Sequence, residues 1–346
     1  MFGRGGKARI GFDWSGETLK AVRVVWDVNT PRITHCVLDE AKGLALAVAR
    51  MRAAGIRPGR GSFHASIPDD GVRVRELDLE GVPEAEIAAA LPAAMTRETG
   101  PAAEGGWVID HQTLRRDERG GRVTVLAAAA PRMEITAYRD SLERAGAGPD
   151  RLEPAGIAAC NHWMRQSGAG SAGPGRALLD IGAAASRITF LHEGYPLRTR
   201  RIEVGGEDFT AEIRERCGIS RDEAERVKRA ETPLGAIRPD RGDRAAPIAD
   251  LIRVSMDRLA GEVRAHRAAF HGRGGLLGGL TLAGGGALLL GIDRALSLRL
   301  DLPVEVIDPF EPFALPEDWS GEKEDRITGE APRFLTALGL TRWWER

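Results

Sequence analysis

Two aspartates, each closing a short apolar run, have the clearest potential for chemistry in this chain. Asp13 follows the run 10–12, and Asp180 lies near the end of the run 177–181. Gly182 and three alanines come after Asp180, so the chain turns there with small side chains that let backbone N–H groups approach an anion. A carboxylate at the mouth of such a turn can hold a metal ion, usually through water. The pattern therefore indicates two related anion-binding turns.

The elements that must position these aspartates are β-hairpins. Residues 9–25 alternate and turn like one hairpin, and residues 177–181 and 186–191 form a strand and a returning strand. A triple glycine, Gly284–Gly286, follows later in the chain. This ordered set of two Asp-bearing hairpins and a glycine turn resembles the nucleotide-binding fold of actin, Hsp70 and the sugar kinases.

Length and composition indicate the broad class of protein. The 346 residues suffice for two or more domains with cores, and 42% hydrophobic with 29% charged residues is typical of a globular protein. The 49 Lys and Arg balance 50 Asp and Glu, so no general nucleic-acid footprint is present. Three scattered cysteines, Cys36, Cys160 and Cys217, have no metal-ligand spacing, which favours reduced thiols in a cytoplasmic protein.

No direct membrane span is expected. The first seven residues lack the apolar stretch of a signal peptide. Residues 276–292 are apolar but short and interrupted by glycines, so a buried strand, a turn and a helix explain them better.

The first part of the chain reads as alternating strands and helices. After the hairpin, the pattern predicts a strand at 32–38, a helix at 39–54 and a strand at 62–67. A compact unit follows, with strands at 74–79, 107–114 and 122–129, a helix opening at Pro83 and a helix at 133–145.

The second part repeats this alternation. A helix is expected from Leu152, then a flexible linker at 168–175 before the second hairpin. Ser220 and Glu223 form a capping box, residues 232–247 are Pro- and Gly-rich, and a long helix is expected at 248–270. A strand at 304–307, an acidic Pro-rich loop and a helix at 334–344 close the chain.

Several segments together resemble the PilM family of actin-like proteins of type IV pilus assembly. They are the segments 10–22, 123–130, 178–183, 201–210, 218–228, 282–286 and 337–340. This resemblance implies an α/β fold: a two-lobed actin-like (ribonuclease-H-like) ATPase fold with an inserted 1C-type subdomain. In the names used for this fold, 1A is the core of lobe I, 1C is the inserted subdomain, 2A is the core of lobe II and 2B is a further subdomain. The implied divisions are 1–71 (1A, first part), 72–150 (1C), 151–175 (lobe I helix and linker), 176–210 (2A, first part), 211–270 (2B), 271–317 (2A, second part) and 318–346 (return to lobe I).

The resemblance also implies a site for ATP between the lobes, with Mg²⁺ held by Asp13 and Asp180 through water. Glu153 occupies the place of an acid that orients water. The residues that it implies for the nucleotide are Asp13, Ser15, Gly16, Thr18, Lys20, Asp180, Gly182, Ala183, Ser186, Gly205, Gly206, Glu225, Lys228, Gly284, Gly285 and Gly286.

Each of these residues also has an ordinary structural role open to it. A strand-end Asp often forms a turn, and Glu225 with Lys228 can be a solvated pair on one helical face. Gly205 and Gly206 can serve as a hinge, and Glu153 can be a charge at a helix start.

Two departures from the family pattern bear on the chemistry. Ser15 stands in the first hairpin where a glycine normally lets phosphate approach, and Arg187 stands in the second where an acid is usual. A cation there weakens Mg²⁺ coordination, although an Arg can itself meet a phosphate. We therefore expect nucleotide binding with at most slow hydrolysis; a lost nucleotide site is the alternative.

Three functions remain open from the sequence. The first is a cytoplasmic scaffold that binds ATP and the N-terminal cytoplasmic tail of a PilN-like inner-membrane protein, with the pilus motor ATPases as further partners. Such a protein is peripheral to the inner membrane through its partner. The second is a small-molecule kinase of the sugar-kinase type, for which no substrate base stands out. The third is a filament-forming, FtsA-like division protein.

Overall fold

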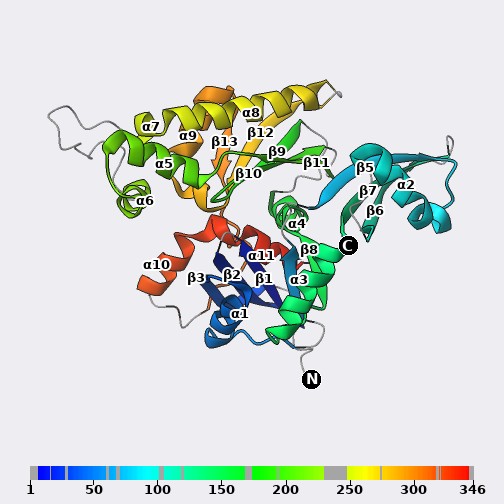
Figure 1. The fold of residues 1–346 in the computed structure, drawn as a ribbon, viewed down its shortest axis with the longest axis horizontal. Coiled ribbons are helices and arrows are strands. Elements are labelled where there is room, and N and C mark those ends of the chain that lie inside the picture. Colours follow the sequence, from blue (N-terminus) through cyan, green and yellow to red (C-terminus); the bar gives the residue numbers. More distant parts are fainter. Residues whose placement is uncertain are drawn as a thin grey trace.

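The protein has two lobes and a smaller third unit (Figure 1). The computed structural model describes residues 7–15, 17–27, 30–59, 62–67, 71–100, 105–117, 121–167, 174–192, 195–229, 248–272, 275–316, 319 and 321–342. No helix in these ranges is long and apolar enough to cross a membrane.

Lobe I is built on a five-stranded sheet with the order β3-β2-β1-β4-β8. Strands β1, β2 and β3 are antiparallel neighbours, whereas β4 and β8 continue the sheet in parallel with β1. The strands are β1 (Lys7–Ser15), β2 (Thr18–Trp26), β3 (Arg32–Glu40), β4 (Phe63–Ile67) and β8 (Arg151–Pro154). Helix α1 (Leu44–Ala53) follows β3.

Lobe II repeats this arrangement with the sheet order β11-β10-β9-β12-β13. Again three antiparallel strands come first and two parallel strands complete the sheet. The strands are β9 (Gly175–Ile181), β10 (Ser186–His192), β11 (Tyr195–Ile202), β12 (Leu277–Ala283) and β13 (Val304–Val306). The shared topology means that Asp13 on β1 and Asp180 on β9 lie on equivalent strands of the two lobes.

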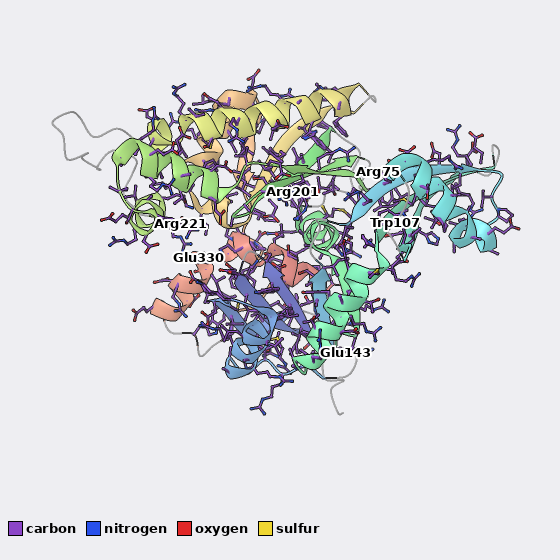
Figure 2. All side chains as sticks on the ribbon, in the orientation of Figure 1. Arg75, Trp107, Glu143, Arg201, Arg221 and Glu330 are labelled. Atoms are coloured by element: carbon purple, nitrogen blue, oxygen red, sulfur yellow. The ribbon has the colours of Figure 1, made fainter. Side chains whose placement is uncertain are left out.

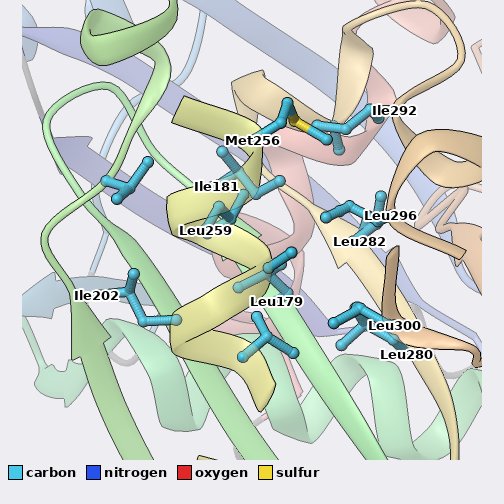
Figure 3. Close-up of a cluster of buried hydrophobic side chains, with 14 of the residues drawn as sticks. Leu179, Ile181, Ile202, Met256, Leu259, Leu280, Leu282, Ile292, Leu296 and Leu300 are labelled. Atoms are coloured by element: carbon cyan, nitrogen blue, oxygen red, sulfur yellow. The ribbon is translucent and has the colours of Figure 1, made fainter. Parts of the chain in front are cut away.

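Lobe II carries its helices around this sheet. They are α5 (Gly206–Cys217), α6 (Arg221–Arg229), α7 (Ile248–Leu251), α8 (Arg253–His271), η2 (Gly285–Leu288) and α9 (Ile292–Leu300). Apolar side chains from β9, β12, α8 and α9 interdigitate, among them Leu179, Leu259 and Leu296, all fully buried (Figure 3). Each such side chain contributes about 1.5–3 kcal/mol by leaving water, so this core holds the second hairpin rigidly.

The third unit is a three-stranded antiparallel sheet, β5-β7-β6, inserted between β4 and β8. Its elements are β5 (Arg73–Glu80), η1 (Glu84–Glu86), α2 (Ile87–Thr99), β6 (Trp107–Asp117) and β7 (Arg122–Pro131). Trp107 on β6 marks this unit in Figure 2. Helix α2 covers one face of the sheet, and α3 (Arg132–Arg144) leads from β7 back to lobe I, where it packs against α1.

The end of the chain returns to lobe I. Helices α10 (Gly321–Thr328), η3 (Ala331–Phe334) and α11 (Leu335–Leu340) follow β13, and every residue of α11 is buried between β1 and α4 (Ala155–Ser167). A β-carbon on Gly11 would lie 1.8 Å from the carbonyl oxygen of Ala337, and one on Gly339 would lie 1.8 Å from that of Ala158. These two glycines therefore let α11 touch β1 and α4 backbone to backbone.

The observed elements correct several sequence expectations. Residues 152–154 belong to strand β8, which pairs in parallel with β4, and the helix starts only at Ala155. Asp39 and Glu40 end β3 rather than opening a helix. The long helix breaks at Ile252 into α7 and α8, and α10 lies in a region expected to be loop.

Other expectations are confirmed or lie outside the described residues. The capping box is present: the Ser220 hydroxyl accepts from the Glu223 amide at 3.2 Å, and the Glu223 carboxylate accepts from the Ser220 amide at 2.9 Å. Residues 168–173, 232–247 and 343–344 are outside the described ranges.

Candidate functional site

Asp13 is buried at the end of β1 and has a charged partner. Lys20, directly opposite on β2, donates from Nζ to Asp13 Oδ2 at 2.7 Å. The hydroxyl of Ser66 at the end of β4 donates to Asp13 Oδ1 at 2.7 Å. Both carboxylate oxygens are thus engaged by protein donors, and the Asp13 charge is balanced inside lobe I.

The tip of the first hairpin folds back on this pair. Lys20 Nζ also donates to Ser15 Oγ at 2.6 Å, so Ser15 takes up a second of the ammonium's three donors. Glu17 has a positive φ of 60°, and Thr18 pairs with Ser15 to close the turn. Gly16 lies outside the described residues.

Glu153 extends the same row across lobe I. It lies on β8 directly beside Ser66 on β4, and it is 6% exposed. Asn161 on α4 donates from Nδ2 to Glu153 Oε1 at 2.7 Å, which fixes the orientation of the carboxylate. The row Lys20, Asp13, Ser66 and Glu153 therefore crosses four adjacent strands, and it places the predicted water-orienting acid near Asp13.

Asp180 on β9 has the same kind of partner in lobe II. Arg187 lies directly opposite on β10, and its Nη1 is 3.4 Å from Asp180 Oδ2. Both side chains are about a quarter exposed, at 24% for Asp180 and 22% for Arg187. This pair is therefore more accessible to a ligand than the pair in lobe I.

The loop at 182–185 joins these strands and presents backbone donors. Its hydrogen bonds run from Gly182 N to Ala185 O at 3.1 Å, from Gly206 N to Gly182 O and from Glu207 N to Ala183 O. Within the described part of the chain, no acceptor is shown for the N–H groups of residues 183–185, and Ala183 is exposed. Consecutive free amides of this kind form a concavity suited to an anion.

Gly205 packs against this loop. A β-carbon on Gly205 would stand 2.4 Å from Ala183 O, so the close approach requires glycine. Ser186, buried, donates to Val204 O at 2.6 Å and ties the same loop to the segment before α5. Gly205, Gly206 and Ser186 thus shape the loop at 182–185.

Glu225 and Lys228 form a clamp between α5 and α6. Lys228 Nζ donates to Glu225 Oε2 at 2.7 Å, to Thr210 Oγ1 at 2.8 Å and to Gly206 O at 3.0 Å, which uses all three of its donors. Partial burial raises the pKa of Glu225, but the hydrogen bonds from Lys228 and Thr210 outweigh it and bring that pKa down to about 2. Burial lowers the pKa of Lys228, against the effect of Glu225.

The triple glycine lies where the lobes meet. A β-carbon on Gly284 would stand 2.2 Å from Asp180 Oδ1, and one on Gly286 would stand 2.1 Å from Ile181 Cγ2. Gly284 N donates to Pro332 O in η3 at 3.0 Å, so this turn connects lobe II to the returning chain. At Gly285 the nearest atom to a β-carbon is Arg333 Nε at 3.7 Å, which leaves room there.

Several predicted site residues therefore come together in two clusters, one at each hairpin. Sequence reasoning missed Ser66, Asn161 and Thr210, which hold Asp13, Glu153 and Lys228. Ser66 is the next-to-last residue of β4 and bonds to Asp13, 53 positions earlier in the chain, a contact that no local pattern reveals. Asn161 and Thr210 lie inside helices, where nothing in the sequence distinguishes them.

Mg²⁺ fits these residues poorly. The described residues hold no group of three His, Cys, Asp or Glu side chains that could ligate a metal. Both Asp13 oxygens already accept hydrogen bonds, and Asp180 faces a guanidinium. A divalent cation prefers several oxygen ligands with uncompensated charge, which these pairs do not supply.

Comparison with known proteins relates the chain to two families. A family model described as type IV pilus assembly protein PilM matches residues 76–236, and one described as cell division protein FtsA matches residues 177–339.

Solved structures extend the likeness over almost the whole chain. A PilM-PilN type IV pilus biogenesis complex is 23% identical, covers 96% of this chain and 97% of that chain, and has a TM-score of 0.78. The ethanolamine utilization protein EutJ from Carboxydothermus hydrogenoformans is 17% identical over 97% of this chain and 89% of that chain, with a TM-score of 0.54. MreB5 of Spiroplasma citri, solved with AMPPNP bound, is 14% identical over 97% and 96%, with a TM-score of 0.48. The predicted two-lobed α/β actin-like fold is confirmed, and the chain is similar to PilM over residues 76–236 and to FtsA over residues 177–339.

Proposed function

We propose that this protein is a cytoplasmic, nucleotide-binding scaffold of type IV pilus or related secretion-system assembly. It binds ATP between its lobes and the N-terminal tail of a PilN-like inner-membrane protein, which holds it at the membrane. The observation that carries the proposal is the match to a chain of a PilM-PilN type IV pilus biogenesis complex across 96% of this chain, insert included.

The nucleotide part of the proposal is supported by the two hairpin clusters. The loop at 182–185 offers free amides, Arg187 offers an accessible guanidinium, and Gly285 leaves space beside them. Guanidinium and backbone N–H groups are the usual donors to phosphate oxygens. ATP is therefore expected to place its phosphates against the second hairpin.

Chemistry at this site is expected to be slow. When bound, Mg²⁺ would neutralise charge on the transferred phosphate, but the pairs at Asp13 and Asp180 fit it poorly. Glu153 is oriented by Asn161 and is the candidate for positioning water among the described residues. A scaffold needs the bound nucleotide for its conformation rather than its turnover, so these features agree with the proposed role.

The partner part is supported by the junction of the insert with lobe I. Strand β6 pairs only with β7 in the described residues, so its outer edge can receive an extended segment. Met133, in the first turn of α3 beside β6, is 62% exposed, and its Cγ would lie 3.1 Å from a β-carbon on Gly105. An exposed methionine next to a strand edge suits an apolar peptide.

The proposal is tested by binding of the full chain to a fluorescent peptide that carries the N-terminal tail of the PilN-like protein. Saturable binding that Met133→Glu weakens at least about tenfold, or by about 1.4 kcal/mol, supports the proposal. Leu298→Glu is the matched control, because Leu298 on α9 is 78% exposed but lies in lobe II. Absence of binding, or equal loss in both variants, contradicts it.

A further inference from the structure

The two hairpins carry the same charge pair at equivalent positions. Asp13 faces Lys20 across β1 and β2, and Asp180 faces Arg187 across β9 and β10. In each pair the cation follows the carboxylate by seven residues and lies directly opposite it. The symmetry of the fold thus places one protein cation next to each carboxylate that would otherwise attract a metal ion.

The charges at these positions leave no demand for a divalent cation. Each pair sums to zero, whereas two unpaired carboxylates would provide two negative charges for Mg²⁺. The pair in lobe I is nearly buried, with 10% of the Lys20 side chain and 6% of the Asp13 side chain exposed. Opening it to admit a metal would leave an unpaired buried charge, which costs several kcal/mol.

The sheet of lobe II carries an additional cation in the same row. Arg201 on β11, which is labelled in Figure 2, lies directly opposite Arg187 on β10 in the strand register, so the two arginines are cross-strand neighbours. Like charges in that position destabilise a sheet unless they are compensated, and here Glu203 bonds to Arg201 Nε at 2.7 Å while Asp180 faces Arg187. The positive charge of this row therefore lies on two neighbouring strands beside the loop at 182–185.

The loop next to Arg187 supplies the other half of an anion site. The free amides of residues 183–185 follow Asp180, and Arg187 follows the loop by two residues. Cation and backbone donors therefore come from one short segment, held in place by Gly205 and Ser186. Guanidinium and backbone N–H groups are protein donors that bind phosphate oxygens directly.

We infer that the protein binds a nucleoside polyphosphate without a divalent cation, with Arg187 balancing the phosphate charge that a metal ion would otherwise balance. This inference rests on the proposed nucleotide binding and concerns the same site. The Asp180 side chain is already 24% exposed while it is paired, so water can solvate its carboxylate when Arg187 turns to the phosphates, and this exchange of partners needs no metal.

The test is titration of the full-length protein with a fluorescent ATP analogue, once in millimolar Mg²⁺ and once in excess EDTA. The inference expects dissociation constants within about threefold of each other. It also expects Arg187→Gln to weaken binding in EDTA at least about tenfold. Arg187→Asp, which restores the acid of the family pattern, should bind only when Mg²⁺ is present.

The controls separate this inference from the function on which it rests. Arg253→Asp makes the same charge change on the exposed first turn of α8 and should bind like the wild type in both buffers. Thermal unfolding confirms that each variant is folded. Wild-type binding that requires Mg²⁺ overturns the inference and leaves nucleotide binding intact, whereas no binding in either buffer overturns both.

Discussion

Arg342 donates from Nε to Nδ1 of His162 at 2.7 Å, in the buried contact between the end of the chain and α4. Because Nδ1 accepts this hydrogen bond, the ring proton is on Nε2, which donates to Pro309 O at 2.8 Å. The guanidinium also lies 4.8 Å from the ring centroid of Trp26. Arg342 therefore keeps His162 neutral and in a single tautomer.

This contact predicts a pH-dependent stability. Burial, with the Arg342 charge, lowers the pKa of His162 from 6.5 to about 3, although the bond to Pro309 acts in the opposite direction. Between those values the unfolded chain binds more protons than the folded one. The contribution of His162 is thus complete above pH 6.5 and is lost as the pH falls toward 3.

Thermal unfolding across this range checks the prediction. The stability of the wild type should fall more steeply below pH 6.5 than that of His162→Gln, by up to about 1.4 kcal/mol per pH unit. His64, whose pKa burial also lowers, is present in both proteins and cancels in the comparison. His111→Gln, in the inserted sheet, is the control that should keep the wild-type slope. Parallel curves for wild type and His162→Gln would refute the tautomer argument.

A second prediction concerns the close approach of α11 and α4. Gly339→Ala would place a methyl group 1.8 Å from the Ala158 carbonyl and should cost about 3 kcal/mol of unfolding free energy. Gly261→Ala, inside α8 with its nearest neighbour at 3.9 Å, should be neutral or stabilising by up to about 1 kcal/mol. Urea unfolding measures both, and equal stability of the two variants would show that the helices can separate freely.

A third prediction concerns the buried pair in lobe I. Lys20→Met leaves Asp13 charged and buried, so it should destabilise the protein by about 3 kcal/mol. The double variant Lys20→Met with Asp13→Leu should recover much of this loss, because no unpaired charge remains. Denaturant unfolding of the single and double variants gives the coupling energy. Strict additivity would mean that the two groups do not stabilise each other.

A fourth prediction concerns turnover. With Arg187 beside Asp180 and no three-ligand metal group in the described residues, ATP hydrolysis should stay below about 1 s⁻¹. Phosphate release by the purified protein measures it, and Glu153→Gln tests the one candidate for positioning water. A faster rate that this substitution abolishes would contradict the scaffold-like behaviour and favour an enzyme.

The sequence predicted the hairpins well because their signals are local. Asp13 and Asp180 end apolar strands, and the small residues after them mark the turns. The strand β8 was mistaken for a helix start because its four residues pair with β4, a partner almost ninety positions earlier that no local pattern reveals. For the same reason the sequence could not show that Ser66 and Asn161 hold the acids of lobe I.

The arrangement of charged side chains around the site was predictable only in part. Arg187 was visible as a cation in an unusual place, but its alignment with both Asp180 and Arg201 depends on strand register. Lys20 was expected to line the phosphate loop, whereas the structure turns it onto Asp13 and Ser15. Whether a side chain contacts a ligand or a neighbouring carboxylate depends on how deeply that side chain is buried. The periodicity of the sequence does not show this.

The position of α11 has a consequence for how the protein is made. Its six buried residues fill the space between β1 and α4, yet they leave the ribosome more than three hundred residues after β1. Lobe I therefore stays incomplete until α11 has emerged, while lobe II has all of its strands once β13 has emerged. Because contacts between such distant segments form slowly, the first lobe to be translated should be the last to fold. The exposed apolar surface of the unfinished lobe I is therefore where chaperones have most to protect.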